Sequence, residues 1–329
     1  MDILVRGIAY HLPEQVLTNQ QLSTEFPDWP IDKIESKTGI VDRHIAGREE
    51  CASDLAYQAA IKLFAGGLSP KDVDFLLFCT QSPDYFLPTT ACILQDRLGI
   101  PTSAGALDFN MGCSGFIYGL SLAHGMIASK QAKNVLLLTA DTYSKFLDPQ
   151  DRGVRTIFGD AAAATWIGSN EGDNSHLGPT LLGTDGRGAE NLIVRGGGLR
   201  HPNSSTSAVD PYLRMNGGEI FAFTLRVVPD LVNRLLQKAG ITANDVDHFV
   251  FHQANRYMLD SLRQKMGIPP EKFVVELRDC GNTVSSTIPI ALKRSAESGR
   301  IKPGDLLMLV GFGVGYSWGA TMLRWHGLE

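Results

Sequence analysis

Apolar residues follow two patterns along the chain. Short runs rich in β-branched and aromatic residues predict strands, and most of these runs lack polar alternation, as expected of strands buried on both faces. Longer segments with apolar residues every three to four positions predict helices. The predicted strands are residues 73–78, 106–109, 134–139, 162–167, 246–251, 273–276, 306–310 and 317–323. The predicted helices are residues 114–129, 219–238, 255–266 and 285–298. This alternation predicts an α/β protein.

A repeat relates two parts of the chain. Residues 71–79 (KDVDFLLFC) recur as residues 244–252 (NDVDHFVFH), and each copy follows a helical segment that ends in a glycine turn. Each unit continues with a second strand, a glycine-bearing turn, a helix and a third strand. An Asp-containing turn before a strand is common by itself, but the shared order of several elements favours a duplication.

The repeat predicts how the chain is organised. We expect an N-terminal half, residues 1–170, and a C-terminal half, residues 171–329, joined around residues 168–178, where Gly, Ser, Asn and Asp cluster. If the halves pair about a pseudo-dyad, the turn at Cys113 faces the turn at Asn282. We therefore expect the chemistry to lie between these two turns.

Composition narrows the class of protein. The 329 residues are 43% hydrophobic and 20% charged, which is enough apolar material for a sizeable core. A formal net charge of −5 and the lack of long Lys/Arg runs argue against nucleic-acid binding. The sequence has neither a run of about 18 apolar residues nor a cationic, apolar leader, so it predicts no membrane span and a cytoplasmic location.

One cysteine differs from the rest. The five cysteines are odd in number and scattered without a CxxC pair, so neither a disulfide framework nor a zinc site is predicted. Cys113 lies in NMGCSGF, between a predicted strand and a predicted helix. Unpaired N–H groups and the positive dipole end of a helix stabilise a thiolate and can hold an oxyanion. We therefore predict a reactive Cys113 and interpret the other four as structural thiols.

Two polar turns in the second half are further candidates. His252 opens the run His-Gln-Ala-Asn at the end of the repeated strand, where ligands bind in α/β sheets. His248 lacks the glutamate and the third ligand of a zinc site, so no metal is expected. Asn282 lies in a Gly-Asn-Thr turn and is most simply a turn residue, but its turn is the counterpart of the Cys113 turn.

Two glycine-rich segments have different interpretations. Residues 311–315, GFGVG, lack the GxGxxG spacing and precede a predicted strand, so they do not predict a nucleotide site. A connection of this kind directs backbone N–H groups toward a carbonyl oxygen. Residues 195–207 predict a long surface loop, either a lid or a segment without function.

Together these segments resemble the β-ketoacyl-acyl-carrier-protein synthase III family of thiolase-like condensing enzymes. The resemblance rests on the order and spacing of GCSGF, HQAN, GNT and GFGxGYxWG, and it extends over nearly the whole chain. It implies a five-layered α/β/α/β/α fold of two duplicated halves, usually a homodimer, with a Cys-His-Asn triad. Asn282 separates the chain from condensing enzymes with a Cys-His-His triad. Plant-type polyketide synthases share the Cys-His-Asn triad but usually have longer chains.

The resemblance also implies a role for each residue of the site. Cys113 would be the nucleophile that accepts an acyl group from a thioester. His252 and Asn282 would donate hydrogen bonds to the malonyl thioester carbonyl and stabilise the enolate left after carbon dioxide departs. The N–H groups of Cys113 and Val314 would form the oxyanion hole. Phe312 would line the place where the carboxylate leaves, because an apolar ring disfavours that charge.

The chain departs from the family at the coenzyme A head group. Family members often carry Trp-Ile-x-x-Arg-Thr-Gly-Ile, in which the Trp stacks on adenine, and here the matching segment is KIESKTGI, with Lys33 and Lys37 in place of Trp and Arg. Trp29 lies four positions earlier, and Arg152 matches the family's other adenine contact. Lys37 and Arg152 are predicted substrate-binding residues, but we expect little specificity for the head group itself.

Other substrate contacts follow from the same resemblance. Asn255 closes the HQAN run, and Arg256 follows one place earlier than the usual arginine, which leaves Tyr257 at the expected carrier-contact position. Leu87 stands where a Phe of the partner subunit commonly closes the acyl tunnel. A smaller side chain there predicts a longer or branched acyl chain.

The predicted activity joins a starter acyl thioester to malonyl-acyl carrier protein with loss of carbon dioxide and yields 3-oxoacyl-acyl carrier protein. The donor is acyl-coenzyme A or acyl-acyl carrier protein, and no cofactor is expected. An alternative keeps the acylation of Cys113 but transfers the acyl group to an amine, a hydroxyl or another carbon nucleophile in specialised metabolism. A catalytically silent partner subunit is disfavoured because Cys113, His252 and Asn282 are all present.

Overall fold

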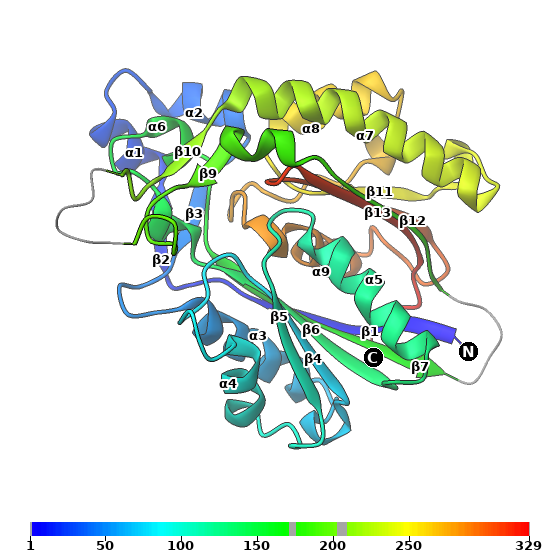
Figure 1. Cartoon of the computed structure of the whole chain (residues 1–329). Coiled ribbons are helices and arrows are strands. Elements are labelled where there is room, and N and C mark those ends of the chain that lie inside the picture. Colours follow the sequence, from blue (N-terminus) through cyan, green and yellow to red (C-terminus); the bar gives the residue numbers. More distant parts are fainter. Residues whose placement is uncertain (1, 171–175, 203–208, 329) are drawn as a thin grey trace.

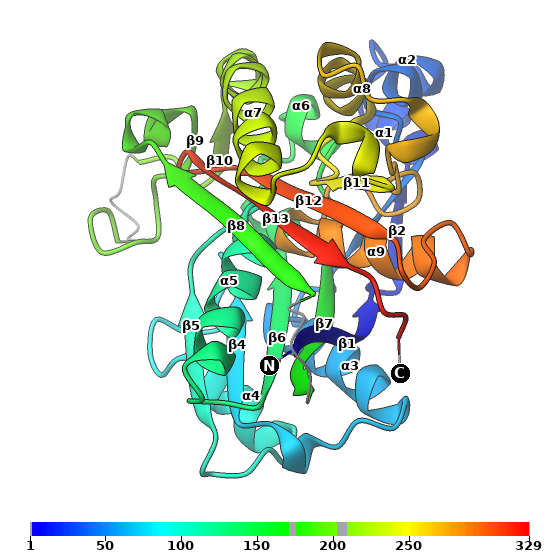
Figure 2. The same cartoon turned by 90° about the vertical axis from the view of Figure 1, so that its right-hand side faces the viewer.

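The chain folds into five layers in which two sheets enclose a central layer of helices (Figures 1 and 2). A computed structural model describes residues 2–170, 176–202 and 209–328. From one outer face to the other, the layers are helices, sheet, helices, sheet and helices. The five-layered α/β/α/β/α fold expected from the sequence is confirmed.

The first sheet is built from the N-terminal part of the chain. Its strand order is β1-β7-β6-β4-β5, in which β4 pairs in parallel with β5 and β6, and β7 pairs antiparallel with β1 and β6. The strands are β1 (Asp2–His11), β4 (Phe75–Cys79), β5 (Gly105–Phe109), β6 (Asn134–Asp141) and β7 (Ala161–Asn170). The central strands β4 and β6 are buried on both faces, as their uninterrupted apolar runs predict.

The second sheet repeats this arrangement with one strand fewer. Its order is β8-β13-β12-β11, with β11 parallel to β12 and the other pairs antiparallel. The strands are β8 (Leu177–Thr184), β11 (His248–Phe251), β12 (Leu306–Gly313) and β13 (Ser317–Arg324). Read from β1 and from β8, the two sheets have the same order and directions.

The predicted strand at residues 273–276 is wrong. Only an isolated bridge joins Phe249 to Phe273, at the edge where β5 lies in the first sheet. Side chains satisfy much of the main chain of this segment instead: Gln253 Oε1 accepts from the Glu276 N–H at 2.8 Å, and Arg300 Nη2 donates to the Phe273 carbonyl at 2.9 Å. A continuous ladder therefore does not form.

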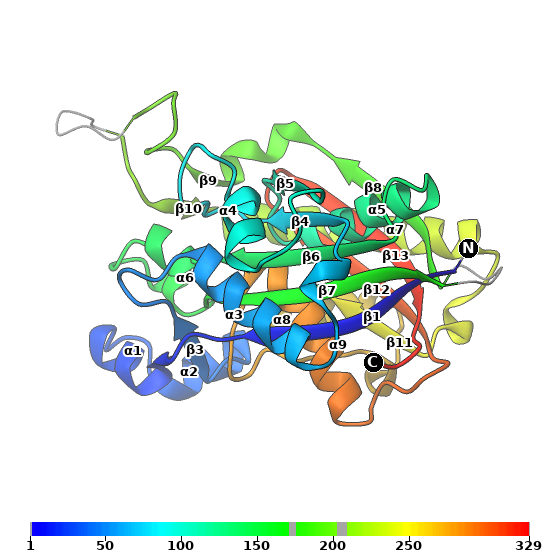
Figure 3. The ribbon, with the colours of Figure 1, turned by 90° about the horizontal axis from the view of Figure 1, so that it is seen from below.

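Helices cover both outer faces and fill the space between the sheets. Helices α5 (Gly115–Ala128) and α9 (Thr287–Glu297) form the central layer and contact both sheets. Helices α3 (Ala52–Ala65) and α4 (Thr90–Arg97) cover the outer face of the first sheet (Figure 3). Helix α7 (Gly217–Ala239) packs on the second sheet and on α8 (Arg256–Lys265). The four helices predicted from periodicity are thus confirmed within two residues at each end.

Smaller elements surround this frame and have no counterpart in the sequence prediction. They are β2 (Gln15–Thr18), α1 (Asn19–Glu25), α2 (Ile31–Thr38), β3 (Asp42–Ile45), α6 (Arg152–Arg155), β9 (Leu192–Val194) and β10 (Leu213–Met215). Short 3-10 helices are Pro70–Asp72, Tyr143–Phe146, Gly186–Asn191, Ala243–Asp245, Pro270–Lys272 and Val284–Ser286.

Two predicted segments are described only in part. The junction at residues 168–178 includes residues 171–175, and the loop at residues 195–207 includes residues 203–207, both outside the described ranges. Residues 195–202 contain neither helix nor strand and follow β9. In the described part of the chain, no helix has both the length and the apolarity needed to cross a membrane.

Candidate active site

Cys113 lies where the first sheet meets the central helix layer. It follows β5 by a short turn and precedes Ser114, the N-cap residue of α5, and it is 6% exposed. The end of β12 lies against it: a Cβ added at Gly313 would be 2.9 Å from Cys113 Cβ and 3.1 Å from Sγ. Only glycine at position 313 lets the second half approach the thiol this closely.

The thiol is not a stabilised thiolate in the resting protein. Burial, with a further contribution from the charge of Asp141, raises the pKa of Cys113 to about 12. The helix terminus was expected to favour the thiolate, and this expectation is wrong because the second half buries the sulfur. The resting thiol is therefore protonated at neutral pH.

His252 is buried and neutral. It follows the last residue of β11, its N–H donates to the Val310 carbonyl at 2.8 Å, and it is 2% exposed. Burial lowers the pKa of His252 to about 3. Its ring meets the ring of Phe312 edge to face, with centroids 5.5 Å apart. Phe312 precedes Gly313, so a two-residue piece of β12 contacts both His252 and Cys113.

Thr287, the first residue of α9, holds the His252 ring. His252 Nδ1 and Thr287 Oγ1 are 2.8 Å apart, and Thr287 Oγ1 is also 3.2 Å from the Val284 carbonyl. The hydroxyl can donate to Nδ1, which leaves the proton on Nε2. It can also accept from Nδ1–H while it donates to Val284, which leaves Nε2 free as a base. Thr287 thus supports either neutral form of His252.

Asn282 is held so that its side-chain amide presents Nδ2 as a donor. Its N–H donates to the Ile157 carbonyl at 2.9 Å, and its carbonyl accepts from Gly159 at 3.0 Å, which fixes the turn on the first half. Asn282 Oδ1 accepts from the Val284 N–H at 2.9 Å. The oxygen is thus occupied and Nδ2 is the group left for a ligand. The turn function and the proposed functional role of Asn282 are therefore compatible.

The two turns meet between the halves. A Cβ added at Gly115, at the start of α5, would lie 3.7 Å from Ser285 Cβ in the Asn282 turn. Val284, in the same turn, is a buried β-branched residue with a φ of +53°. Such a conformation costs about 1–3 kcal/mol and occurs mostly at functional sites.

Two main-chain donors lie beside the thiol. Among residues 2–170, 176–202 and 209–328, the N–H groups of Cys113 and Val314 donate to no other residue. Val314 follows Gly313 directly, and Ser317 Oγ donates to the Val314 carbonyl at 2.7 Å, which holds this connection. The arrangement fits the oxyanion hole predicted for Cys113 and Val314.

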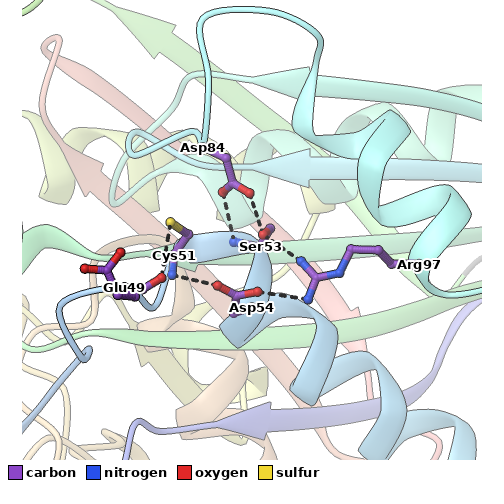
Figure 4. Close-up of polar contacts among 6 residues, drawn as sticks. All are labelled: Glu49, Cys51, Ser53, Asp54, Asp84 and Arg97. Carbon is purple, nitrogen blue, oxygen red and sulfur yellow. Dashed lines mark hydrogen bonds and ion pairs between the residues drawn. The ribbon is translucent and has the colours of Figure 1, made fainter.

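The loop that carries Leu87 is fixed at its base and exposed at its tip. Asp84 accepts from the Ser53 hydroxyl at 2.6 Å, and Arg97 donates to the same hydroxyl and pairs with Asp54, each at 2.9 Å (Figure 4). Leu87 itself is 82% exposed. It lines, with residues that include Val314, a cavity of about 1210 Å³. The cavity thus reaches from Leu87 to the residue beside Gly313.

The residues predicted to meet the coenzyme A head group gather around one indole. Lys33 Nζ lies 5.3 Å, Lys37 Nζ 5.1 Å and Arg152 Cζ 5.4 Å from the centre of the Trp29 ring. Trp29 precedes α2 by two residues, and a shift of four positions, about one helical turn, brings it beside Lys33 and Lys37. An aromatic ring therefore lies at this place although Lys33 replaces the Trp of the family motif.

Asn255 and Arg256 lie at the start of α8, which contacts α2. Asn255 caps the helix, because its side chain accepts from the Met258 N–H at 2.9 Å. Arg256 pairs with Asp260 at 2.8 Å, and a Cβ at Gly39 would lie 2.4 Å from Arg256 Cβ, so α8 begins against the end of α2. Asn255 therefore has a structural role as a helix cap, and its substrate-binding role stays a prediction.

Sequence reasoning missed Thr287, Val284 and Asp141. None of them belongs to a motif with a known chemical meaning, and their roles depend on contacts between segments far apart in the chain. Within the described ranges, no group of three His, Cys, Asp or Glu side chains is placed to hold a metal ion.

This fold and site define a class. Two sheets with the same strand order enclose the central helices. A buried Cys lies between a strand and a helix, and the second half contributes a His and an Asn. This fold and this site are those of a thiolase-like condensing enzyme. A family model of 3-oxoacyl-[acyl-carrier-protein] synthase III matches residues 107–186. A second model, of the C-terminal part of the same family, matches residues 236–325.

Individual relatives agree with this class. The chain is 37% identical to a β-ketoacyl-[acyl-carrier-protein] synthase III of Syntrophomonas wolfei, covering 99% of this chain and 98% of the relative. The chain is also similar to a 3-oxoacyl-(acyl-carrier-protein) synthase III of known crystal structure, with 54% sequence identity and a TM-score of 0.97. The match covers 98% of this chain and 100% of the other chain. The priming β-ketosynthase of the R1128 polyketide pathway is 27% identical, with a TM-score of 0.92 and coverage of 100% and 97%. The chain belongs to the 3-oxoacyl-[acyl-carrier-protein] synthase III family and is a condensing acyltransferase.

Proposed function

We propose that Cys113 is acylated by a starter thioester and that the acyl group is then condensed with malonyl-acyl carrier protein. The observation that carries the proposal is the piece of β12 that joins the two functions: Gly313 lies against the Cys113 thiol, and Phe312 contacts the His252 ring. Asn282, with its oxygen occupied, offers its Nδ2 as a donor from the turn that meets α5.

The first half-reaction is thioester exchange. The Cys113 sulfur attacks the thioester carbonyl while its proton passes to His252, and the N–H groups of Cys113 and Val314 stabilise the oxyanion. The tetrahedral intermediate collapses, the donor's thiolate leaves, and it takes the proton from His252. A neutral His252, which Thr287 keeps competent as a base, suits this step.

The second half-reaction is a decarboxylative condensation. His252 Nε2–H and Asn282 Nδ2 donate hydrogen bonds to the malonyl thioester carbonyl, the carboxylate leaves as carbon dioxide beside the apolar ring of Phe312, and an enolate forms. Its carbon attacks the acyl thioester on Cys113. Collapse of that intermediate yields 3-oxoacyl-acyl carrier protein and frees the Cys113 thiolate, which takes one proton from the solvent.

The partners follow from the same proposal. Acyl carrier protein delivers the malonyl group, and Arg256 with the exposed Tyr257, which stacks on Phe221 at 5.3 Å, lies at the proposed carrier contact. The chain would act as a homodimer in the cytoplasm without a cofactor, with Leu87 at the acyl tunnel of the partner subunit. The exposed Tyr85, Phe86 and Leu87 support such a contact between copies.

Intact-protein mass spectrometry tests the acylation step. Exposure to acyl-coenzyme A or acyl-acyl carrier protein should give one acyl adduct, which is lost in Cys113→Ala. Cys280→Ala is the matched control, because Cys280 is also buried and burial raises its pKa to about 12. An adduct that persists in Cys113→Ala contradicts the assignment.

Addition of malonyl-acyl carrier protein tests the condensation. The acyl enzyme should lose its adduct and release a product two carbons longer, with one carbon dioxide per turnover. His252→Ala and Asn282→Ala should lower malonyl decarboxylation by about 10²–10³-fold each. An acyl enzyme that ignores malonyl-acyl carrier protein but transfers its acyl group to an amine or a hydroxyl would support the alternative acyltransferase.

A further inference from the structure

Asp141 is a buried carboxylate that neither half-reaction uses. It is the last residue of β6 and is 0% exposed. Its Oδ1 accepts from the Gln81 N–H at 2.8 Å, just beyond β4. Its Oδ2 accepts from the Ser285 hydroxyl at 2.5 Å and from the Ser285 N–H at 3.4 Å. One carboxylate therefore ties two strand ends of the first half to a turn of the second half.

The turn that Asp141 holds is the one that carries Asn282. Ser285 lies three residues after Asn282 and is itself buried. On the opposite side, the Asn282 main chain is bonded to Ile157 and Gly159. Between these attachments lies Val284, whose φ of +53° needs support from its surroundings. Loss of the Ser285 attachment would release one side of the turn that orients the Asn282 amide.

The carboxylate is held by neutral donors only. No lysine or arginine in the described part of the chain bonds to Asp141, and the titratable groups that sense its charge or act on it are Cys79, Cys113, Tyr143 and Asp160. Burial raises the pKa of Asp141 itself to about 7. A buried carboxylate without a cation is costly, and a neutral residue would fill the space more cheaply.

We propose that Asp141 is a positioning residue: its bonds to Ser285 hold the Asn282 turn for decarboxylation. This inference rests on the roles proposed above for Cys113 and Asn282. It assigns Asp141 to the second half-reaction, because the Ser285 attachment acts on the Asn282 turn and not on the nucleophile.

Two variants test the attachment of the Asn282 turn. Asp141→Asn removes the charge and presents an NH₂ group to one of the donors, whereas Ser285→Ala removes the hydroxyl and keeps the charge. Asp108→Asn is the matched control, because Asp108 also accepts two main-chain N–H groups, from Thr90 and Ala91 at 2.6 Å, but lies at α4 and not at the Asn282 turn. Circular dichroism checks that each variant is folded.

The readouts are single-turnover acylation of Cys113, followed by intact mass, and the rate of malonyl-acyl carrier protein decarboxylation. Both variants should lose about 10²-fold in decarboxylation, the cost of displacing a positioned group by roughly 1 Å. Acylation of Cys113 should stay near the wild-type rate in both variants. Asp108→Asn should match the wild type in both assays.

Two outcomes overturn the proposal. One is wild-type decarboxylation in Ser285→Ala, and the other is an equal loss of acylation and decarboxylation in that variant, which a general disturbance of the fold would give. If Asp141→Asn does not fold, Ser285→Ala decides by itself, because it removes only the hydroxyl. A wild type that neither acylates Cys113 nor decarboxylates malonyl-acyl carrier protein refutes the proposed function instead.

Discussion

Hydrogen-bond direction decides what single residues of this site can do. Asn282 Oδ1 accepts from the Val284 N–H, which orients the amide so that Nδ2 is left to donate to a ligand. His252 has no such fixed direction, because the Thr287 hydroxyl can rotate between donating to Nδ1 and donating to Val284. The proposed reaction needs this freedom, since Nε2 acts as a base toward Cys113 and as a donor toward the malonyl carbonyl.

Thr287 therefore affects both half-reactions. Thr287→Val keeps the shape but leaves the buried Nδ1 without a partner, a cost of about 1–3 kcal/mol, so acylation and decarboxylation should each fall by about 10-fold or more. Thr287→Ser restores the hydroxyl and should recover most of both rates. Single-turnover acylation and malonyl decarboxylation measure the two effects. A valine variant with wild-type rates in both assays contradicts a role for the hydroxyl.

At the scale of elements, α2 and α6 bring cations to one aromatic ring. The Arg152 guanidinium lies 5.4 Å from the Trp29 ring, less than the roughly 7 Å that a base inserted between two planes needs. Arg152 is half-exposed and its ion pair with Asp28 spans 4.0 Å, so its displacement costs little. An adenine ring can therefore enter once this side chain moves.

Trp29→Ala tests whether this surface binds the coenzyme A head group. Loss of a stacking contact of about 1–3 kcal/mol should lower kcat/KM for acyl-coenzyme A by about 5–100-fold. The rate with the same acyl group on pantetheine should not change, because pantetheine lacks adenine. Lys33→Ala is the control, with a small and salt-dependent effect. Equal losses for both donors would show that Trp29 acts on folding or on the acyl end.

Strands and helices were predictable from the sequence where a single local pattern of apolar residues determined them. The apolar runs of β4, β6 and β12 and the periodicity of α5, α7, α8 and α9 needed no tertiary information. Residues 273–276 have the same β-branched character, but Gln253 and Arg300 take over their main-chain bonds, which no local pattern shows. Helices α1 and α2 span only 7 and 8 residues, too few for a clear periodicity.

The sequence indicated which residues to expect at the candidate site but not their protonation states. Glycine-framed turns and the resemblance picked out Cys113, His252 and Asn282, which lie in turns that the fold brings between the halves. The protonation state of Cys113 depends on burial by Gly313 and on the charge of Asp141, which lie 200 and 28 residues away in the chain. Such an effect arises only after the halves assemble.

At the scale of the whole molecule, buried groups of the site link stability to pH. His252 keeps its pKa near 3 when folded, against 6.5 when unfolded, so the unfolded chain binds one more proton between these values. Its contribution to stability is present above pH 6.5 and is lost as the pH falls. Asp141 acts in the opposite sense, because its folded pKa near 7 exceeds 3.8, so it lowers stability as the pH rises between these values.

A substitution at His252 isolates the contribution of this residue to the pH dependence of stability. The free energy of unfolding of the wild type should fall relative to that of His252→Gln as the pH is lowered from about 6 to about 4. The slope of the difference should approach about 1.4 kcal/mol per pH unit, and the Asp141 term cancels between the two proteins. Urea titrations at several pH values measure it. A difference that does not depend on pH would show that His252 titrates normally in the folded chain.

The central layer also determines where side chains can be exchanged without a steric clash. The nucleophile turn and the Asn282 turn both lead into helices enclosed by two sheets, and Gly119 of α5 lies so close to β6 that an added Cβ would come 2.6 Å from Leu137 Cδ1. A side chain larger than glycine at position 119 would therefore collide with the first sheet. The Trp29 cluster and the Leu87 loop lie on peripheral elements outside this enclosed layer. Under the proposed function, the choice of donor and of acyl chain can therefore be redesigned at these peripheral elements without touching the residues that form the new bond.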